Sequence, residues 1–219
     1  MYLTRISLQP HPDIGALLHH LGDAYREHQM LWRLFDEDRD AQRDFLYRRD
    51  PHQRGPRYFL LSKRPPGNDL GLWRIDPPKP FQPRLTPGQQ LAFSLRANPV
   101  ISRDGRRHDV VMDAKHRMGW KRLPQAGRPP LQQLVHEAGA AWLRERAARH
   151  GFAVDEELLR VEAYQQHATR RGNRVIRFST LDFAGLLTVT EPGSFSKALA
   201  KGIGPAKAFG CGLLLVRRV

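Results

Sequence analysis

Apolar and polar positions alternate at the start of the chain, which is the two-residue period of a strand. Tyr2–Leu8 follows this alternation, so the sequence predicts a strand there. A helix is expected to open at Pro12-Asp13, because apolar residues then recur at spacings of three and four. The stripe consists of Leu17, Leu21, Ala24, His28, Leu31 and Phe35.

The rest of the first half predicts strands separated by a long extended segment. Arg57–Lys63 is an apolar run typical of a strand, and Gln90–Asn98 alternates until Pro99 ends it. Between them, Pro65–Pro87 is rich in Pro and Gly and is expected to form an extended loop around a short strand at Leu72–Ile75. The first half therefore predicts the order strand, helix, strand, strand.

The second half predicts a similar set of elements. They are a helix over Leu131–Arg149, strands over Leu158–His167 and Arg174–Thr190 joined by a Gly172-Asn173 turn, a helix that Ser194 caps and that runs to Lys201, and a strand over Gly212–Val219. Two split βαβ units in tandem fit these elements and the 219 residues. We therefore expect an α+β protein with domains at residues 1–105 and 129–219, joined by a basic linker or loop at residues 106–128.

The charge balance indicates a polyanionic partner. The chain holds 36 basic and 22 acidic residues, a formal net charge of +14, and 29 of the basic residues are Arg. Arg presents a planar fork of donors that matches phosphates and guanine edges, so nucleic acid is the simplest partner. A GC-rich genome would also raise the share of Arg over Lys, but it would not explain the excess of bases over acids.

The excess charge is concentrated in three segments. Residues 100–128 carry eight basic and three acidic residues, residues 165–177 carry four and none, and residues 194–219 carry five and none. The remaining residues balance at 19 basic and 19 acidic. The sequence therefore predicts a nucleic-acid cradle built mainly by the second half, away from the first helix.

Other features exclude several classes of protein. Cys211 is the only cysteine of the sequence, so neither a disulfide framework nor a cysteine-based zinc site is expected. Residues 1–10 lack the pattern of a signal peptide, and no apolar run reaches the roughly 18 residues of a membrane span. We expect a soluble, cytoplasmic protein without a membrane partner.

Tyr25 and His28 are the first candidates for chemistry. They lie three residues apart on the predicted first helix, so their side chains share a face. A histidine can take the proton of a ribose 2′-hydroxyl near neutral pH, and the oxygen can then attack the adjacent phosphate without a metal ion. The alternative is a partly buried core histidine, because His28 lies within the apolar stripe beside Leu31 and Trp32. The spacing alone favours that alternative.

A metal site is not expected. His108, Asp109, Asp113 and His116 cluster in the basic segment, but their spacing matches no ligand pattern and the neighbouring arginines oppose a divalent cation. We therefore expect neither a metal nor another cofactor.

The run from Gly202 to Gly212 is a candidate phosphate-binding loop. Its glycines let backbone N–H groups approach a phosphate closely, which makes Gly202, Gly204 and Lys207 candidates for RNA binding. The run lacks the Gly-Lys-Ser/Thr ending of a Walker A loop. The alternative is a tight connection before the last strand.

The predicted hairpin is strongly basic. Its arginines lie within eight residues that contain no acid, which favours a nucleic-acid contact over an ordinary solvated turn. The candidates for RNA binding are Arg170, Arg171, Arg174 and Arg177 of the hairpin, with Arg106 and Arg107 of the basic segment.

Several groups of residues occur in the order in which a known family has them. They are MYLTRISL at the start, Tyr25-x-x-His28 with Trp32, PPKPF at Pro77–Phe81, LRANP at Leu95–Pro99 followed by Gly105-Arg106, and GIGPAKAFGCGLL at Gly202–Leu214. On these motifs the chain resembles the CasE (Cse3) family of CRISPR repeat-processing endoribonucleases. LRANP and the glycine-rich run are the most specific of the motifs.

The resemblance implies two tandem ferredoxin-like (RRM-like) βαββαβ domains that bind the stem-loop of a CRISPR repeat. It also implies one metal-independent cut at the 3′ base of the stem, which leaves a 2′,3′-cyclic phosphate and a 5′-hydroxyl. The enzyme then stays on its product as a subunit of the Cascade interference complex. Repeat RNA and other Cascade subunits are therefore the implied partners.

The resemblance also places functional residues. The family's catalytic histidine falls on His28 and the tyrosine of some members on Tyr25, which reverses the expectation from spacing. A family hairpin that contacts the RNA stem aligns loosely with Arg170–Arg177. The stretch between Arg106 and Leu131 is longer than the family leads us to expect, and its role stays open. The alternatives are a non-catalytic double-RRM-like RNA-binding protein and a DNA-binding protein.

Overall fold

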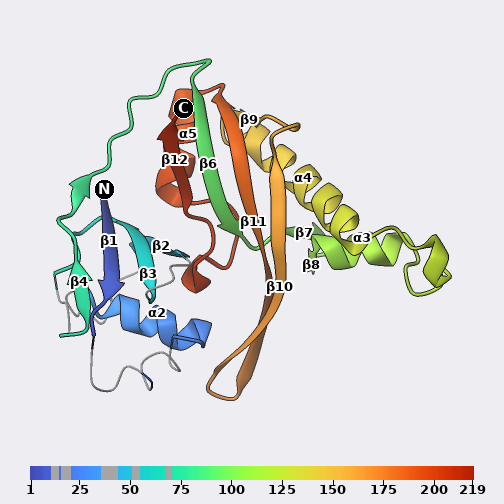
Figure 1. Ribbon diagram of the computed structural model, residues 1–219, viewed down its shortest axis with the longest axis horizontal. Helices are drawn as coiled ribbons and strands as arrows, with labels where there is room; N and C mark the ends of the chain where they lie inside the picture. The colour runs from blue at the N-terminus through green and yellow to red at the C-terminus, as the bar shows by residue number, and fades with distance from the viewer. Residues whose placement is uncertain (11–14, 16–20, 36–43, 51–54, 68–70) are drawn as a thin grey trace.

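The computed structural model describes residues 1–10, 15, 21–35, 44–50, 55–67 and 71–219. Two antiparallel sheets, one from each half of the chain, form the framework of the molecule (Figure 1). The predicted helix start at Pro12-Asp13 and Leu17 of its stripe lie outside the described residues.

The first sheet has the strand order β2-β3-β1-β4, with β5 also paired to β1. Its strands are β1 (Tyr2–Leu8), β2 (Phe45–Asp50), β3 (Arg57–Ser62), β4 (Trp73–Ile75) and β5 (Lys79–Pro80). Helix α2 (Ala24–Trp32) packs on one face of this sheet through an apolar cluster that includes Leu31, Phe45 and Tyr58.

The second sheet repeats the same order, β10-β11-β6-β12, with β9 paired to β11. Its strands are β6 (Gln90–Ala97), β9 (Phe152–Val154), β10 (Arg160–Arg171), β11 (Arg174–Val189) and β12 (Leu214–Arg218). Helices α4 (Leu131–Arg149) and α5 (Pro192–Lys201) bury Trp142 and Phe195 in its core. When the short strands β5 and β9 are left out, in both sheets the second strand along the chain is at one edge and the first lies between the third and the last. The structure thus confirms an α+β protein with two tandem ferredoxin-like domains.

The strand β6 belongs to the second sheet, and this corrects the expected domain division at residue 105. Leu95 of β6 pairs with Phe183 of β11 on one side and with Leu214 of β12 on the other. The connection between the sheets is the proline-rich segment before Gln90, which runs along the edge of the molecule in Figure 1. Prolines cannot donate to a strand ladder, so this segment suits a linker.

Residues 106–128 are not a plain linker, which corrects a second expectation. The region contains a hairpin of β7 (Val100–Arg103) and β8 (Arg106–Asp109), helix α3 (Val110–Arg117) and the short helix η1 (Gln125–Gly127). Asp104 and Gly105 both have positive φ, as a two-residue type I′ turn requires, and Asp109 Oδ1 accepts from Met112 N at 2.7 Å to cap α3. Val110 and Val111 fix α3 to the second core.

The prediction missed β2, which lies between the first helix and β3. Phe45 and Tyr47 face the core under α2, whereas Leu46 belongs to a third cluster with Leu61 and Leu213 that joins the two domains. A strand buried on both faces shows no alternation of apolar and polar residues, so its period could not reveal it.

In the part of the predicted stripe that the structure describes, helix α2 begins at Ala24, because the Asp23 carboxylate caps it. One other helix start differs from the prediction. Helix α5 begins at Pro192 with Glu191 at the capping position, so Ser194 lies inside the helix, where its hydroxyl donates to Glu191 Oε2 at 3.2 Å.

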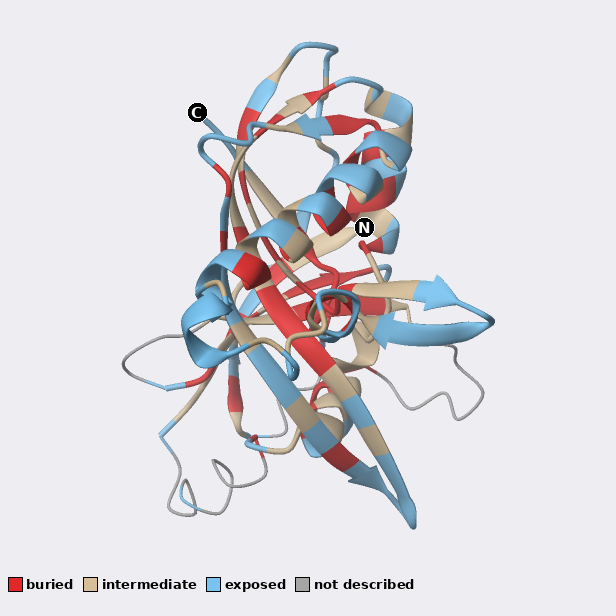
Figure 2. Cartoon of the chain, turned by 90° about the vertical axis from the view of Figure 1, so that its right-hand side faces the viewer, coloured by how far each residue is buried: buried red, intermediate tan, exposed pale blue. Residues whose placement is uncertain are grey.

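The β10–β11 hairpin extends beyond the body of the second sheet. Its two-residue turn, Gly172-Asn173, is confirmed, with Gly172 at φ 57° as the first residue of a type II′ turn requires. Figure 2 shows that the far end of this hairpin is exposed, whereas its base is buried beneath α4. Within the described parts of the chain, every helix is too short or too polar to cross a membrane.

Candidate active site

The start of helix α2 sets the placement of the two predicted catalytic side chains. Asp23 Oδ1 accepts from the backbone N–H groups of Tyr25 at 3.0 Å and of Arg26 at 2.9 Å. These bonds satisfy donors that the first turn of a helix leaves unpaired. With the helix begun there, Tyr25 and His28 stand one turn apart on the same face.

The imidazole of His28 is held among aromatic rings. It stacks on Phe45 and Tyr47 of β2, with ring centroids 5.7 Å and 6.3 Å away, and meets the edge of Trp32 at 5.7 Å. The residue is half-buried. His28 thus packs on the first core, as the apolar stripe suggested, and still reaches the surface, so the two interpretations of its position are compatible.

His28 and Tyr25 line one open cleft of about 470 Å³. Three segments far apart in the sequence form its walls: α2 with the residue that follows it, the β10–β11 hairpin, and the glycine-rich run. The lining residues are Tyr25, His28, Gln29, Trp32, Arg33, Arg171, Ile176, Ala208 and Phe209. The structure therefore places an arginine of the predicted RNA-binding hairpin beside the predicted catalytic pair.

A hydrogen bond between the domains joins the hairpin to α2. Thr169 Oγ1 of β10 donates to Asp23 Oδ2 at 2.9 Å, and Thr169 is buried. Partial burial alone would raise the pKa of Asp23, but the hydrogen bonds from Arg26 N, Thr169 and Tyr25 N outweigh it and lower that pKa. The Asp23 carboxylate is therefore ionised near neutral pH and serves the helix and the hairpin together.

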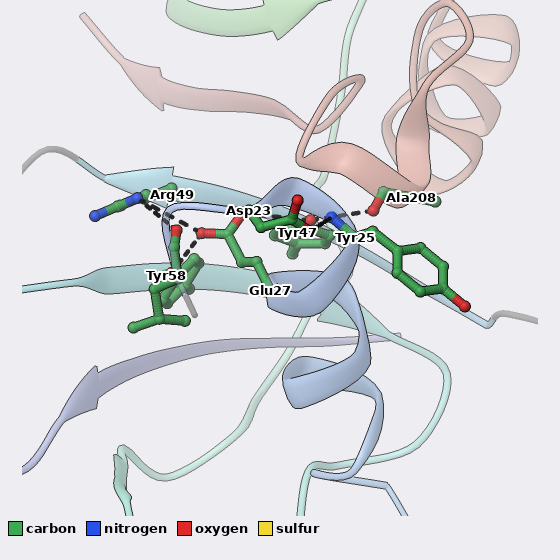
Figure 3. Close-up of polar contacts among 8 residues, drawn as sticks. Asp23, Tyr25, Glu27, Tyr47, Arg49, Tyr58 and Ala208 are labelled. Atoms are coloured by element: carbon green, nitrogen blue, oxygen red, sulfur yellow. Dashed lines mark hydrogen bonds and ion pairs between the residues drawn. The ribbon is translucent and has the colours of Figure 1, made fainter. Parts of the chain in front are cut away.

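A buried polar network lies on the other side of α2 (Figure 3). Glu27 Oε1 accepts from Tyr58 at 2.6 Å, its Oε2 lies 3.5 Å from the Tyr47 hydroxyl, and Arg49 lies 3.8 Å away. Figure 3 shows Glu27 and Tyr25 pointing to opposite sides of the helix, as a two-residue separation requires. Burial raises the pKa of Glu27, and burial with the nearby Glu27 charge raises the pKa values of both tyrosines, so the phenols stay neutral donors.

Tyr47 connects this network to the glycine-rich run. Its hydroxyl donates to the carbonyl oxygen of Ala208 at 3.1 Å, in the short helix η2 (Lys207–Phe209). Ala208 and Phe209 line the cleft, so this bond holds one wall of the cleft against the first domain. Sequence reasoning missed Glu27, Tyr47 and Tyr58. The available signal was the acidic Glu27 directly beside His28 in an otherwise apolar stripe.

Gly202, the first residue of the glycine-rich run, lies at the interface between the domains. Gly202 is buried at φ 74°, and its N–H donates to Ala198 O at 2.8 Å. A Cβ there would lie 2.9 Å from both Leu46 Cδ1 and the carbonyl oxygen of Gly212. The structure therefore corrects the expectation that the Gly202 amide approaches RNA, and it supports the alternative of a tight connection. Gly204 and Lys207 are half-buried in the same run, and Gly204 packs against the ring of Trp142.

The hairpin arginines divide between two faces. Arg171 pairs with Arg174 and Thr169 pairs with Ile176, so these four share the face that meets α2. Arg170 and Arg177 lie on the opposite face by the same register. All four arginines are exposed, as are Arg106 and Arg107 of β8. Among the predicted RNA-binding arginines, the cleft beside His28 is lined by Arg171.

The carboxylates once considered as metal ligands have other partners. Asp109 accepts from Met112 N and from the Tyr164 hydroxyl, and Asp113 is paired with Arg103 at 2.9 Å and Arg117 at 3.0 Å. The described residues contain no group of three or more His, Cys, Asp or Glu side chains placed to hold a metal ion.

Comparison with known proteins settles the family. A family model described as "CRISPR associated protein" matches residues 1–218. The chain is 28% identical over 232 residues to the CRISPR-associated endoribonuclease Cse3 of Thermus thermophilus, covering 99% of both chains. It is 29% identical over 194 residues to the Cascade subunit CasE of Escherichia coli, covering 88% of this chain and 90% of the relative. The chain belongs to the CasE (Cse3) family. The family resemblance found in the sequence is thereby confirmed.

Solved structures of CasE-family proteins share this fold. Thermus thermophilus Cse3 bound to an RNA that represents a pre-cleavage complex superposes with a TM-score of 0.77 at 27% identity, covering 99% of this chain and 98% of that one. Cse3 bound to a 19-nucleotide RNA gives a TM-score of 0.76 at 27% identity, with 99% and 100% covered. These RNA-bound relatives thus share the architecture of this chain over nearly its whole length.

Proposed function

We propose that this CasE-family protein is a metal-independent endoribonuclease that cuts CRISPR precursor RNA at the 3′ base of the repeat stem-loop. The observation that carries the proposal is the single cleft in which His28 and Tyr25 of the first domain meet Arg171 of the second. Its relatives are named as a CRISPR-associated endoribonuclease and as a Cascade subunit.

The proposed reaction is an internal transesterification. His28 takes the proton of the ribose 2′-hydroxyl, and the 2′-oxygen attacks the adjacent phosphorus as the bond from phosphorus to the 5′-oxygen breaks. The imidazolium returns its proton to the departing 5′-oxygen. The products are a 2′,3′-cyclic phosphate and a 5′-hydroxyl, so protons and electrons balance without a co-reactant.

The other cleft residues have supporting roles in this reaction. Tyr25 hydrogen-bonds a non-bridging phosphate oxygen, and its own hydroxyl is oriented by Gln29 Nε2, which donates to it at 3.5 Å. Arg171 offsets the charge that develops on the pentacoordinate phosphorane. Lys207, a candidate for RNA binding in the sequence, is a less suitable cation for this role than Arg171, because Arg171 lines the cleft.

The donor set of the cleft supports a reaction without a metal. Its described lining residues offer an imidazole, a phenol, an amide and two guanidinium groups, and no carboxylate. Divalent cations such as Mg²⁺ are held by carboxylate oxygens, and the two cations of the cleft would repel them.

The partners follow from the charge and from the family. Exposed arginines outside the cleft, such as Arg170 and Arg174 of the β10–β11 hairpin and Arg106 of β8, bind the phosphates of the repeat stem. The protein then stays on its product and acts as a subunit of Cascade; the Escherichia coli relative is named as a Cascade subunit, which supports the second part of this proposal.

The proposal is tested with an end-labelled repeat hairpin. The wild-type protein should cut once at the 3′ base of the stem in excess EDTA, and the products should carry the stated ends. A substrate with a 2′-deoxy nucleotide before the cut should bind and stay intact. His28→Ala should abolish cutting while leaving the dissociation constant within a few-fold. Binding by wild type without any cutting would instead establish a non-catalytic RNA-binding protein.

A further inference from the structure

A second cleft of about 450 Å³ adjoins the catalytic one. Ile176 and Phe209 line both, so the two clefts meet at these side chains. The second cleft lies between β8, the far half of the β10–β11 hairpin and the glycine-rich run. Its lining includes Arg107, Gln166, His167, Arg177, Phe178 and Phe209.

Three stacked rings form a ladder along this cleft. The His167 and Phe178 centroids are 4.8 Å apart with planes 18° from parallel, and Phe178 and Phe209 are 4.8 Å apart at 15°. Both faces of Phe178 are therefore covered. Phe209 ends the ladder next to the catalytic cleft and is half-buried, so a nucleobase can extend the stack there.

The polar side chains of the cleft differ in their availability. Asn98 donates to Ser179 O at 2.7 Å, and Asp109 caps α3, so both serve the fold. Arg107 and Arg177 are exposed cations from two different strands, and they border the same cleft. Two guanidinium groups beside an aromatic ladder suit a nucleotide, with its base on the rings and a phosphate on the cations.

The position of the cut identifies the nucleotide that the second cleft could bind. Under the proposed function, the stem lies on the 5′ side of the scissile phosphate, and its bases are paired and stacked. A base can enter a cleft only when it is unpaired. The first unpaired nucleotide beyond the catalytic cleft is therefore the one on the 3′ side.

We propose that the second cleft binds the nucleotide immediately 3′ of the scissile phosphate, with its base on Phe209 and its following phosphate between Arg107 and Arg177. This inference rests on the proposed function. Because that nucleotide carries the departing 5′-oxygen, holding it aligns the leaving group with the attacking 2′-oxygen. The cleft should thus act on the cleavage rate, whereas the stem determines most of the affinity.

The first experiment changes the RNA alone. Single-turnover cleavage by saturating wild-type protein is compared on the intact repeat hairpin and on one with an abasic residue 3′ of the cut. The abasic substrate should be cut about fivefold to a hundredfold more slowly, the range of one base–aromatic stack. Equal rates on the two substrates would overturn the inference, whereas failure to cut either would overturn the proposed function.

The second experiment pairs protein variants with the two substrates. Phe209→Leu should slow cutting of the intact RNA but add little on the abasic RNA, because the stack is already lost. An equal loss on both would mean that Phe209 only shapes the catalytic cleft, which contradicts base stacking.

The third experiment tests the phosphate. A neutral methylphosphonate replaces the phosphate that follows the nucleotide 3′ of the cut. On this substrate Arg177→Gln should slow cleavage much less than it does on the natural RNA. Arg106→Gln also removes one positive charge, but from a position on β8 next to Arg107 that lies outside the cleft, so its effect should be equal on both backbones. If Arg177→Gln slows cleavage equally on both backbones, the assignment of Arg177 to this phosphate is wrong.

Discussion

Thr169 donates a 2.9 Å hydrogen bond to the carboxylate of Asp23, although 146 residues separate the two in the chain. The other oxygen of that carboxylate caps the helix that carries Tyr25 and His28. The hairpin that binds the RNA stem in our proposal is thus tied directly to the start of the catalytic helix. In our proposal, docking of the stem and placement of Tyr25 and His28 are therefore linked through one carboxylate.

We expect Thr169→Val, which keeps the shape and removes the hydroxyl, to lower the single-turnover cleavage rate several-fold. The affinity for the repeat hairpin should hardly change, because no basic side chain is lost. Asp23→Ala should do more, since losing the cap costs about 1 kcal/mol of stability as well. The measurements are the rate at saturating protein, the dissociation constant and chemical unfolding. A wild-type rate for Thr169→Val would show that the bond has no part in positioning α2.

The bond from Tyr47 to Ala208 allows a matched comparison with Tyr58. Tyr47→Phe keeps the ring that stacks on His28 but removes the donor to Ala208 O, so the wall of the cleft should loosen and cleavage should slow. Tyr58→Phe removes only the donor to Glu27. Tyr58→Phe should lose about 1–3 kcal/mol of unfolding free energy, because it leaves the buried Glu27 carboxylate short of a donor. Tyr47→Phe should lose about 0.5–1.5 kcal/mol, because the Ala208 carbonyl that loses its donor is only half-buried.

The readout that separates these two variants is the cleavage rate at a temperature where both remain folded. Tyr47→Phe should be the slower enzyme. Equal rates would assign Tyr47 to stability alone.

Arg170 and Arg171 are neighbours with the same charge on opposite faces of the hairpin. Arg171→Ala should reduce the rate of the chemical step by about tenfold to a thousandfold, as for the loss of a group that stabilises charge in a transition state. Arg170→Ala should weaken binding without changing the rate at saturation, and it should lower the salt dependence of binding by about one phosphate contact. The reverse pattern would place the reacting phosphate on the other face.

Because the pKa of Glu27 is raised, we expect the contribution of this residue to the free energy of unfolding to depend on pH. Because burial raises this pKa in the folded state, the folded protein holds the proton at pH values where the unfolded chain has released it. The contribution of Glu27 to stability is therefore fully present below its ordinary value of 4.5 and is lost as pH rises through the higher folded value.

Glu27→Gln keeps an acceptor for Tyr58 and cannot ionise. The unfolding free energy of the variant, relative to wild type, should therefore increase with pH from about 4.5 upward. Urea unfolding of both proteins across the acidic and neutral range measures this difference. A difference that does not vary with pH would mean that Glu27 titrates as it does in the unfolded chain.

Local patterns predicted most of the second domain correctly. The helix over Leu131–Arg149 and the turn at Gly172-Asn173 stand where they were expected, because periodicity and turn residues act over a few positions. In the first domain β2 was missed, since burial on both faces removes the alternation that marks a strand. The predicted number of strands in the first domain was still nearly right, because the strand predicted at Gln90–Asn98 was assigned to that domain and took the place of β2.

By itself, the sequence determined the class of fold, the basic hairpin, the pairing of Tyr25 with His28 on one helix face, and the family. These properties depend on the spacing and charge of residues close together in the chain and on short motifs. Only the tertiary structure decided that β6 joins the second sheet, that Arg171 lines the catalytic cleft, that Gly202 packs between the domains, and that Asp23 and Tyr47 tie the two domains together. Each of these depends on contacts between residues distant in the chain, and alternation or spacing shows that a side chain will be buried without showing what it will be buried against.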